Sequence, residues 1–223
     1  MKQIEILATK DGSNTVIHPI LQETYHSVNG AINESVHVFI NAGLAHCLAY
    51  KPHLNVLEIG FGTGLNALMT LRHIYNRCHS VNYVGLEPFP LEYNLVAKLD
   101  YLSELHALHL QTHFEKMHLS EFNKTLSLEN NFFFTKKEKT LQLAQLEKQF
   151  DLVYYDAFAP SAQPELWETE VLTKVKEAMV VGGVLVTYCA KGKFKRLLKA
   201  LDFEVEALSG PPGKREMTRA IRK

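Results

Sequence analysis

The sequence predicts an α/β fold built on one mainly parallel sheet, and three observations favour it. Short apolar runs recur at residues 55–59, 81–87, 150–156 and 183–189. Between them lie segments such as 65–76 and 166–179, whose apolar residues have helical spacing. The sequence contains no internal repeat, which excludes solenoid and propeller folds. Strands that alternate with helices in this way pair mainly in parallel.

Length and patterning predict one domain over residues 1–223. With 223 residues, of which 46% are hydrophobic, the chain is long enough for one sizeable core. Residues 51–223 form the predicted Rossmann-like core, and residues 1–50 a small N-terminal extension. In the extension, residues 4–9 and 15–19 flank the turn-rich 10–14 and predict a hairpin, and 33–50 has helical spacing. Region 104–148 fits either a strand and a helix or a partly ordered insertion.

The composition excludes several classes of protein. Three widely spaced cysteines suit neither a disulfide framework nor a zinc knuckle, so we expect reduced thiols in a cytoplasmic protein. The N-terminus lacks a signal-peptide pattern, and no stretch approaches the roughly 20 apolar residues of a membrane span. The net charge is zero, yet residues 191–223 carry ten Lys or Arg against four acids. This basic tail is either a solvated face or a site for an anionic partner such as nucleic acid.

Three glycines follow the first predicted core strand, in "LEIGFGTGLN" at residues 57–66. Ligands of open α/β sheets bind beyond the carboxyl ends of the strands, and glycines there let backbone N–H groups approach a ligand closely. The dinucleotide pattern G-x-G-x-x-G requires a third glycine at position 65, where Leu65 stands, so NAD and FAD are disfavoured. With Glu58 before the loop, the pattern resembles motif I of class I S-adenosylmethionine-dependent methyltransferases. A purely structural turn is the alternative.

Two acids end neighbouring predicted strands. Glu87 ends the predicted strand at 81–87, the next strand after the glycine loop. An acid at this position can accept hydrogen bonds from ribose hydroxyls, in methyltransferases and dehydrogenases alike. Asp156 ends the strand at 150–156, before a loop stiffened by Pro160 and Pro164 and a helix expected near Glu165. Asp156 therefore faces the predicted crevice, unless it only caps a turn. Methyltransferases that act on nitrogen place an acid or amide at this position.

Several motifs together resemble the methyltransferase domain of the bacterial bifunctional tRNA 5-methylaminomethyl-2-thiouridine biosynthesis proteins. They are "YHSVNGAINESVHVFINAGL", "LEIGFGTGLN", "LEPFPL", "DAFAPSAQPELW" and "GPPGKREM", in the family's order between about residues 11 and 219. The resemblance implies a class I methyltransferase fold with an antiparallel C-terminal edge and S-adenosylmethionine as the cofactor. The implied substrate is the aminomethyl group of 5-aminomethyl-(2-thio)uridine at the tRNA wobble position. No flavin oxidase domain follows, so we expect a stand-alone methyltransferase, functionally linked to a separate enzyme that makes the aminomethyl-uridine.

The resemblance also assigns residues. It places the catalytic aspartate at Asp156, and it places cofactor contacts at Glu58, Gly60, Phe61, Gly62, Thr63, Gly64, Asn66 and Glu87. Substrate contacts are expected from Asn29, Gly30 and Glu34, from Phe158 packing against the base, and from Lys191, Lys214 and Arg215 at the phosphates of the anticodon stem-loop. The family often has a "GD" pair where this chain reads "FFFTKKEKT". Glu138 is a doubtful substitute, so the adenine contact is unassigned.

The expected chemistry needs no metal. With an ordinary pKa near 4, Asp156 would orient the amine and stabilise its growing positive charge, while water, Tyr25 or Glu34 takes the final proton. His106, His109 and His113 have spacing that could place them on one helical face, yet N-methyl transfer has no use for zinc. Two other functions stay open, namely an aminopropyltransferase of the polyamine-synthase type and a non-catalytic nucleotide- or RNA-binding module.

Overall fold

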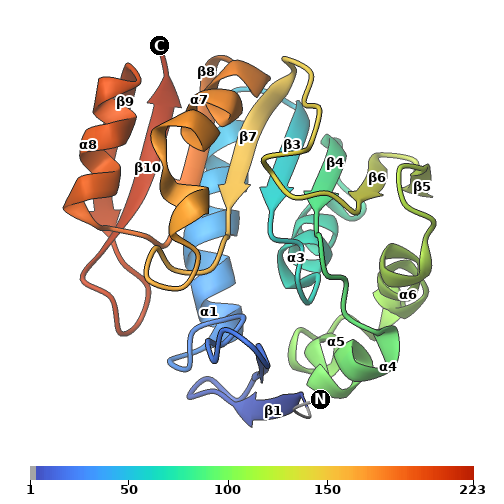
Figure 1. Cartoon of the computed structure of the whole chain (residues 1–223). Coiled ribbons are helices and arrows are strands. Elements are labelled where there is room, and N and C mark those ends of the chain that lie inside the picture. Colours follow the sequence, from blue (N-terminus) through green and yellow to red (C-terminus); the bar gives the residue numbers. More distant parts are fainter. Residues whose placement is uncertain (1–3) are drawn as a thin grey trace.

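The computed structural model describes residues 4–223 and contains a two-stranded and an eight-stranded sheet (Figure 1). The strand order in the large sheet is β5-β6-β4-β3-β7-β8-β10-β9. The five strands from β6 to β8 pair in parallel, whereas β5, β10 and β9 add antiparallel pairings at the two edges. This confirms the predicted mainly parallel sheet with an antiparallel C-terminal edge. The strands are β3 His53–Ile59, β4 Ser80–Leu86, β5 Thr125–Glu129, β6 Phe132–Lys137, β7 Phe150–Tyr155, β8 Met179–Thr187, β9 Phe203–Ser209 and β10 Glu216–Arg222.

Helices cover both faces of the sheet, so its central strands are apolar on both sides. Every residue of β7 is buried, with Leu152 and Tyr154 packing on one face and Val153 and Tyr155 on the other. The first face is covered by η1 Val36–Ala45, α3 Leu65–Ile74 and α6 Gln111–Leu119. The second face is covered by α7 Thr169–Ala178 and α8 Gly192–Ala200. In Figure 1, α7 lies on the viewer's side of the sheet and the α1–η1 helix on the far side.

The N-terminal extension contains the predicted hairpin and helix. Strands β1 Glu5–Ala8 and β2 Asn14–Ile17 pair antiparallel, which confirms the hairpin. The helix spans residues 31–48 as α1 Ala31–Ser35, η1 and α2 His46–Leu48, with η1 wound as a π-helix. It therefore begins and ends about two residues earlier than the periodicity of 33–50 predicts. Among the described residues, no helix is both long and apolar enough to cross a membrane.

The region left open by the sequence is ordered. It begins where α5 Tyr101–Glu104 ends, after α4 Tyr93–Val96 and η2 Ala97–Leu99, and it holds η3 Leu108–Leu110, α6 and the β5–β6 hairpin. Its last residues, 138–148, form turns and loops outside helices and strands. Strand β6 pairs with β4, so this region extends the main sheet. After β7, the 3-10 helix η4 Pro164–Trp167 begins beside Glu165, where the sequence predicts a helix start, and α7 follows from Thr169.

Candidate active site

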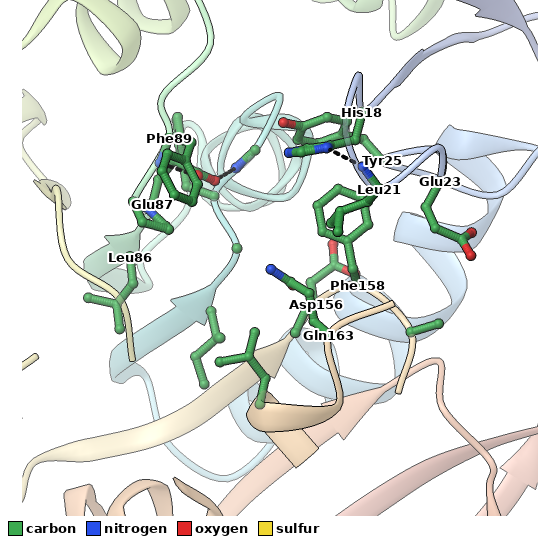
Figure 2. Close-up of a pocket in the computed structure, with 18 of the residues that line it drawn as sticks. His18, Leu21, Glu23, Tyr25, Leu86, Glu87, Phe89, Asp156, Phe158 and Gln163 are labelled. Atoms are coloured by element: carbon green, nitrogen blue, oxygen red, sulfur yellow. Dashed lines mark hydrogen bonds between the residues drawn. The ribbon is translucent and has the colours of Figure 1, made fainter. Parts of the chain in front are cut away.

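A cavity of about 740 Å³ lies at the carboxyl ends of β3, β4 and β7 (Figure 2). Its walls are the glycine loop after β3, residues 86–89 after β4, residues 139–142 before β7, residues 156–166 after β7, and parts of the N-terminal segment 18–27. Glu34 of α1, Tyr188 after β8 and Lys214 in the β9–β10 loop complete the lining. The cavity thus lies where the parallel sheet predicts a ligand site.

The glycine loop approaches its neighbours too closely for side chains. Gly60, Gly62 and Gly64 have φ values of +88°, +51° and +74°, in the left-handed region that favours glycine. A Cβ atom at Gly60 would lie 2.6 Å from the Asp156 carbonyl oxygen, and one at Gly62 would lie 3.0 Å from the Tyr25 ring. The loop therefore presents bare backbone between β3, β7 and the N-terminal extension.

Glu87 is buried against this loop. Its Oε2 accepts a hydrogen bond from the Gly62 N–H at 2.8 Å, and its Oε1 accepts one from the Phe89 N–H at 2.9 Å. Burial raises the pKa of Glu87, while these two backbone hydrogen bonds oppose the rise. A carboxylate at this point can accept hydrogen bonds from the hydroxyls of a ligand in place of those from the backbone N–H groups.

Two other members of the predicted loop have side chains engaged within the protein. The Phe61 ring packs against the rings of His118 and Phe134, with centroid separations of 5.2 and 5.5 Å. The Thr63 hydroxyl lies 2.6 Å from His26 Nε2, which joins the loop to the N-terminal extension. Their predicted cofactor contacts would therefore come mainly from the backbone.

Asn66 connects the buried carboxyl group of Glu58 with the half-buried one of Asp156. Its Nδ2 donates to Asp156 Oδ2 at 2.8 Å and to Glu58 Oε1 at 3.0 Å, while Ser35 donates its hydroxyl hydrogen to Asn66 Oδ1. Glu58 has no exposed surface, and burial together with the charge of Asp156 raises its pKa well above the usual range. The raised pKa favours the neutral form of Glu58, which accepts the hydrogen bond from Asn66.

Asp156 has an altered acidity. Burial, followed by the charge of Glu34, raises its pKa to about 7, although the hydrogen bond from Asn66 and the charge of Lys214 lower it. The expectation of an ordinary pKa near 4 is therefore wrong, because it ignored the burial that the fold imposes. Near neutral pH, Asp156 is ionised in part and can accept a proton.

Glu34 and Lys214 form an ion pair in the same cavity. The Glu34 Oε1 atom also accepts the Ser27 N–H at 3.3 Å, and Lys214 Nζ lies 3.9 Å from the centroid of the Tyr188 ring. The prediction placed Lys214 beside Arg215 at the phosphates, but this ion pair holds its ammonium inside the cavity. Arg215 and Lys191 are exposed and lie outside the lining.

Three aromatic rings form a cluster at the cavity wall, from His18, Tyr25 and Phe158 (Figure 2). Tyr25 and Phe158 are 5.1 Å apart between centroids, and His18 lies 5.3 Å from Phe158. Burial and the charge of Glu87 raise the pKa of Tyr25 far above neutrality, so it stays a phenol and is a poor proton acceptor. Sequence patterning missed His18 and Tyr188. Tyr188 directly follows the parallel strand β8, so the rule that ligands bind beyond the carboxyl ends of parallel strands would have identified it.

Asn29 and Gly30, predicted to bind substrate, do not line the cavity. Asn29 Oδ1 accepts a hydrogen bond from Lys10 Nζ at 2.8 Å, and a Cβ atom at Gly30 would lie 2.6 Å from Asp11 Oδ2. Both residues hold the start of α1 against the N-terminal hairpin, so their substrate contacts stay a prediction that the cavity does not support. Glu34 and Phe158, by contrast, line it.

The three spaced histidines do not share one helix. His106 lies in the connection after α5, His109 in η3 and His113 in α6, where His113 Nε2 lies 2.9 Å from Glu129 Oε1. Within residues 4–223, no group of three or more His, Cys, Asp or Glu side chains is arranged to hold a metal ion.

Comparisons with known proteins identify relatives. Residues 102–223 match the profile of a family described as S-adenosyl-L-methionine-dependent methyltransferase. The chain is 30% identical, over 98% of its length, to the tRNA 5-methylaminomethyl-2-thiouridine biosynthesis bifunctional protein MnmC of Cupriavidus metallidurans, of which it covers 34%. It is 32% identical, over 88% of its length, to the protein of the same name from Aromatoleum aromaticum, of which it covers 32%. The chain thus spans about a third of the length of these curated relatives.

A solved structure supports the fold. The crystal structure of MNMC2 from Aquifex aeolicus matches with a TM-score of 0.76 and 24% sequence identity, covering 100% of this chain and 71% of that one. These findings confirm the resemblance to the methyltransferase part of the bifunctional proteins.

Proposed function

Because the chain belongs to the S-adenosyl-L-methionine-dependent methyltransferases, we propose that it methylates the aminomethyl nitrogen of 5-aminomethyl-(2-thio)uridine at the wobble position of tRNA. Relatives that align over most of the chain are named for the biosynthesis of 5-methylaminomethyl-2-thiouridine in tRNA. The observation that carries the proposal is Asp156, a half-buried carboxyl group with a pKa of about 7 in the cavity wall. Such a group can both attract an amine and remove its proton.

The cavity fits the methyl donor. S-adenosylmethionine supplies an electrophilic methyl group when bound, and 740 Å³ is within the range of small-molecule sites. Gly60, Gly62 and Gly64 leave bare backbone for its amino-acid end, in a loop where added Cβ atoms would collide with neighbours. The buried Glu87 carboxylate would hold the ribose hydroxyls. Tyr25 and Phe158 line the cavity together with Asp156 (Figure 2).

Asp156 would act on the acceptor amine. A primary ammonium ion has no lone pair, so its nitrogen becomes a nucleophile only after it loses a proton. Asn66 occupies Oδ2 of Asp156, which leaves Oδ1 for the amine. The ionised carboxylate would pair with the ammonium and accept its proton, and the resulting acid would then pass that proton to solvent. The regenerated carboxylate would stabilise the positive charge that appears on nitrogen as the methyl group is transferred.

The aromatic cluster would receive the base. Unpaired RNA bases stack on aromatic side chains, and enzymes that modify a base swing it into the pocket. His18, Tyr25 and Phe158 offer such surfaces next to Asp156. A uridine stacked there would direct its aminomethyl group toward the carboxylate.

The exposed cations near the C-terminal edge would bind the anticodon stem-loop. Lys191, Lys193 and Arg196 lie at the start of α8, and Arg215 lies in the β9–β10 loop. Exposed Lys and Arg side chains of this kind bind phosphates. With this substrate, the protein would act in the cytoplasm and would depend on a separate enzymatic activity that makes the aminomethyl-uridine.

An acidic cavity also suits the second candidate, an aminopropyltransferase of the polyamine-synthase type. Glu23, Glu34 and Glu87 line the cavity with Asp156 and would attract a polyamine. The match to the methyltransferase family favours methyl transfer over aminopropyl transfer. The same match argues against a non-catalytic binding module.

The test uses two donors and two acceptors. The full-length protein is incubated with methyl-labelled S-adenosylmethionine and tRNA from cells that lack this enzyme, and separately with decarboxylated S-adenosylmethionine and a diamine. We expect label in the 5-methylaminomethyl nucleoside of the digested tRNA, and little label with Asp156→Asn. An aminopropylated diamine without tRNA methylation would establish the second candidate instead.

A further inference from the structure

The ion pair between Glu34 and Lys214 joins two distant parts of the chain inside the cavity. Glu34 lies in α1, and Lys214 lies in the β9–β10 loop, 180 residues later. The side chain of Glu34 is 8% exposed and that of Lys214 is 30% exposed. Both line the cavity with Asp156. Burying two charges carries a desolvation penalty that an apolar pair of similar size would avoid, so stability alone does not explain this pair.

The surroundings hold the pair in place. The Tyr188 ring lies 3.9 Å below the Lys214 ammonium, and the Tyr188 hydroxyl donates to the Ala157 carbonyl at 2.8 Å, one residue after Asp156. The β9–β10 loop packs so closely on the start of α1 that a Cβ atom at Gly213 would lie 2.2 Å from Asn29 Nδ2. The ammonium is thus fixed between a carboxylate and an aromatic face, beside the segment that carries Asp156.

Asp156 is surrounded by ionisable groups from several elements. Asn66 of α3 is its neutral hydrogen-bond partner. The ionisable groups around it are Glu58 of β3, Glu87 after β4, Glu34 of α1, Tyr188 after β8, Tyr25 of the N-terminal extension and Lys214. Lys214 is the cation of this set, and Glu34 is the acid that it neutralises.

We propose that Glu34 and Lys214 are a positioning pair for Asp156, in which Glu34 strengthens and Lys214 weakens the hold of Asp156 on its proton. This inference rests on the proposed function. A nearby carboxylate disfavours ionisation of Asp156, and a nearby ammonium favours it. The directions in which the two residues act on the Asp156 pKa agree with this assignment. The pair would keep Asp156 ionised enough to accept a proton and basic enough to take it from an amine.

The experiment titrates Asp156 in the full-length protein without donor or tRNA. Carboxyl ¹³C NMR follows the aspartates against pH, and the Asp156 resonance is identified by its loss in Asp156→Asn. We expect Glu34→Gln to lower the midpoint and Lys214→Met to raise it, each by about one pH unit or more. Lys214→Arg keeps the charge and should keep the midpoint. Lys195→Met removes a 2.6 Å ion pair with Glu216 that does not line the cavity, and it should have no effect.

The outcomes are decisive whatever the substrate is. Midpoints that do not move, or that move in the same direction in Glu34→Gln and Lys214→Met, overturn the proposal. If Lys214→Met does not fold, the proposal is tested with Glu34→Gln and with the double variant Glu34→Gln, Lys214→Met. The double variant removes both charges and should return the Asp156 midpoint toward that of the wild type. The lower limb of the pH–rate profile for methyl transfer should shift as the NMR midpoint does. Opposite NMR shifts with no tRNA methylation would uphold the pair and reject the proposed function.

Discussion

Replacing Gly60 by alanine tests how tightly the glycine loop fixes Asp156. Gly60 has a φ of +88°, and an added Cβ atom would lie 2.6 Å from the Asp156 carbonyl oxygen. Gly182 in β8 is a matched control, because its φ is +78° and a Cβ atom there would meet nothing within 4 Å. Gly182→Ala therefore introduces the backbone strain alone, whereas Gly60→Ala adds a collision with the segment that carries Asp156.

The two contributions differ in size and in consequence. Left-handed backbone costs an alanine about 1–2 kcal/mol, and both variants should lose this much in free energy of unfolding. Relieving the collision to an ordinary 3.4 Å contact requires a displacement of 0.8 Å, the difference between 3.4 and 2.6 Å. Overpacking of this kind costs a further ~1–3 kcal/mol in stability. A misplacement of this size at Asp156 should also slow methyl transfer by about 10²-fold.

Two measurements separate these effects. Urea denaturation gives the free energy of unfolding, and single-turnover methylation at saturating S-adenosylmethionine gives the rate. Gly182→Ala should be destabilised but as fast as the wild type, whereas Gly60→Ala should be both less stable and slower. Equal stabilities and equal rates for the two variants would refute the argument that close approach to Asp156 requires a glycine at position 60.

Four further predictions concern the donor, the carboxylate and the RNA. Gly62→Val should leave a folded protein that no longer binds S-adenosylmethionine in calorimetry, because the added side chain meets the Tyr25 ring. Asp156→Asn should slow single turnover at a cost of about 2.7–4 kcal/mol in the transition state. Because the Asp156 pKa rises from 3.8 to about 7 on folding, the folded state binds more protons between these values, so wild-type stability falls from pH 4 to 7. Asp156→Asn should lack this fall, which is on the order of 2 kcal/mol in urea denaturation compared at pH 5 and 8. Lys191→Ala with Arg215→Ala should weaken tRNA binding and reduce its log–log salt slope by about 0.7–0.9 per lost phosphate contact, with unchanged donor affinity.

Local patterning predicted four of the eight strands of the main sheet, and it predicted the glycine loop. The four apolar runs became β3, β4, β7 and β8, since buried parallel strands are apolar on both faces and stand out from helical spacing. Region 104–148 was not predictable in the same way. Strand β6 follows β5 after a short turn, and it is buried only at alternate positions. The π-helical winding of η1 leaves no signal in the spacing of apolar residues.

The residues of the site likewise differ in whether local sequence predicts them. Asp156 and Glu87 were found because each directly follows a strand, and topology brings the ends of parallel strands together. The pairing of Glu34 with Lys214 spans 180 residues, and nothing in the local sequence of either residue specifies it. The acidity of Asp156 could not be predicted either, because it depends on burial and on charges that only the folded chain assembles.

The position of β10 has a consequence for how the site opens. Strand β9 joins the sheet only through β10, which lies between β9 and β8. The two strands therefore form a hairpin that docks on β8 as a unit, and the loop at its tip carries Lys214. Such a hairpin is a natural unit of local unfolding, whose amides would exchange with solvent together. Each opening would withdraw the ammonium from Glu34 and leave Asp156 facing an unneutralised acid. The acidity of the site would then fluctuate on the timescale of hairpin opening, although no atom of the parallel sheet had moved.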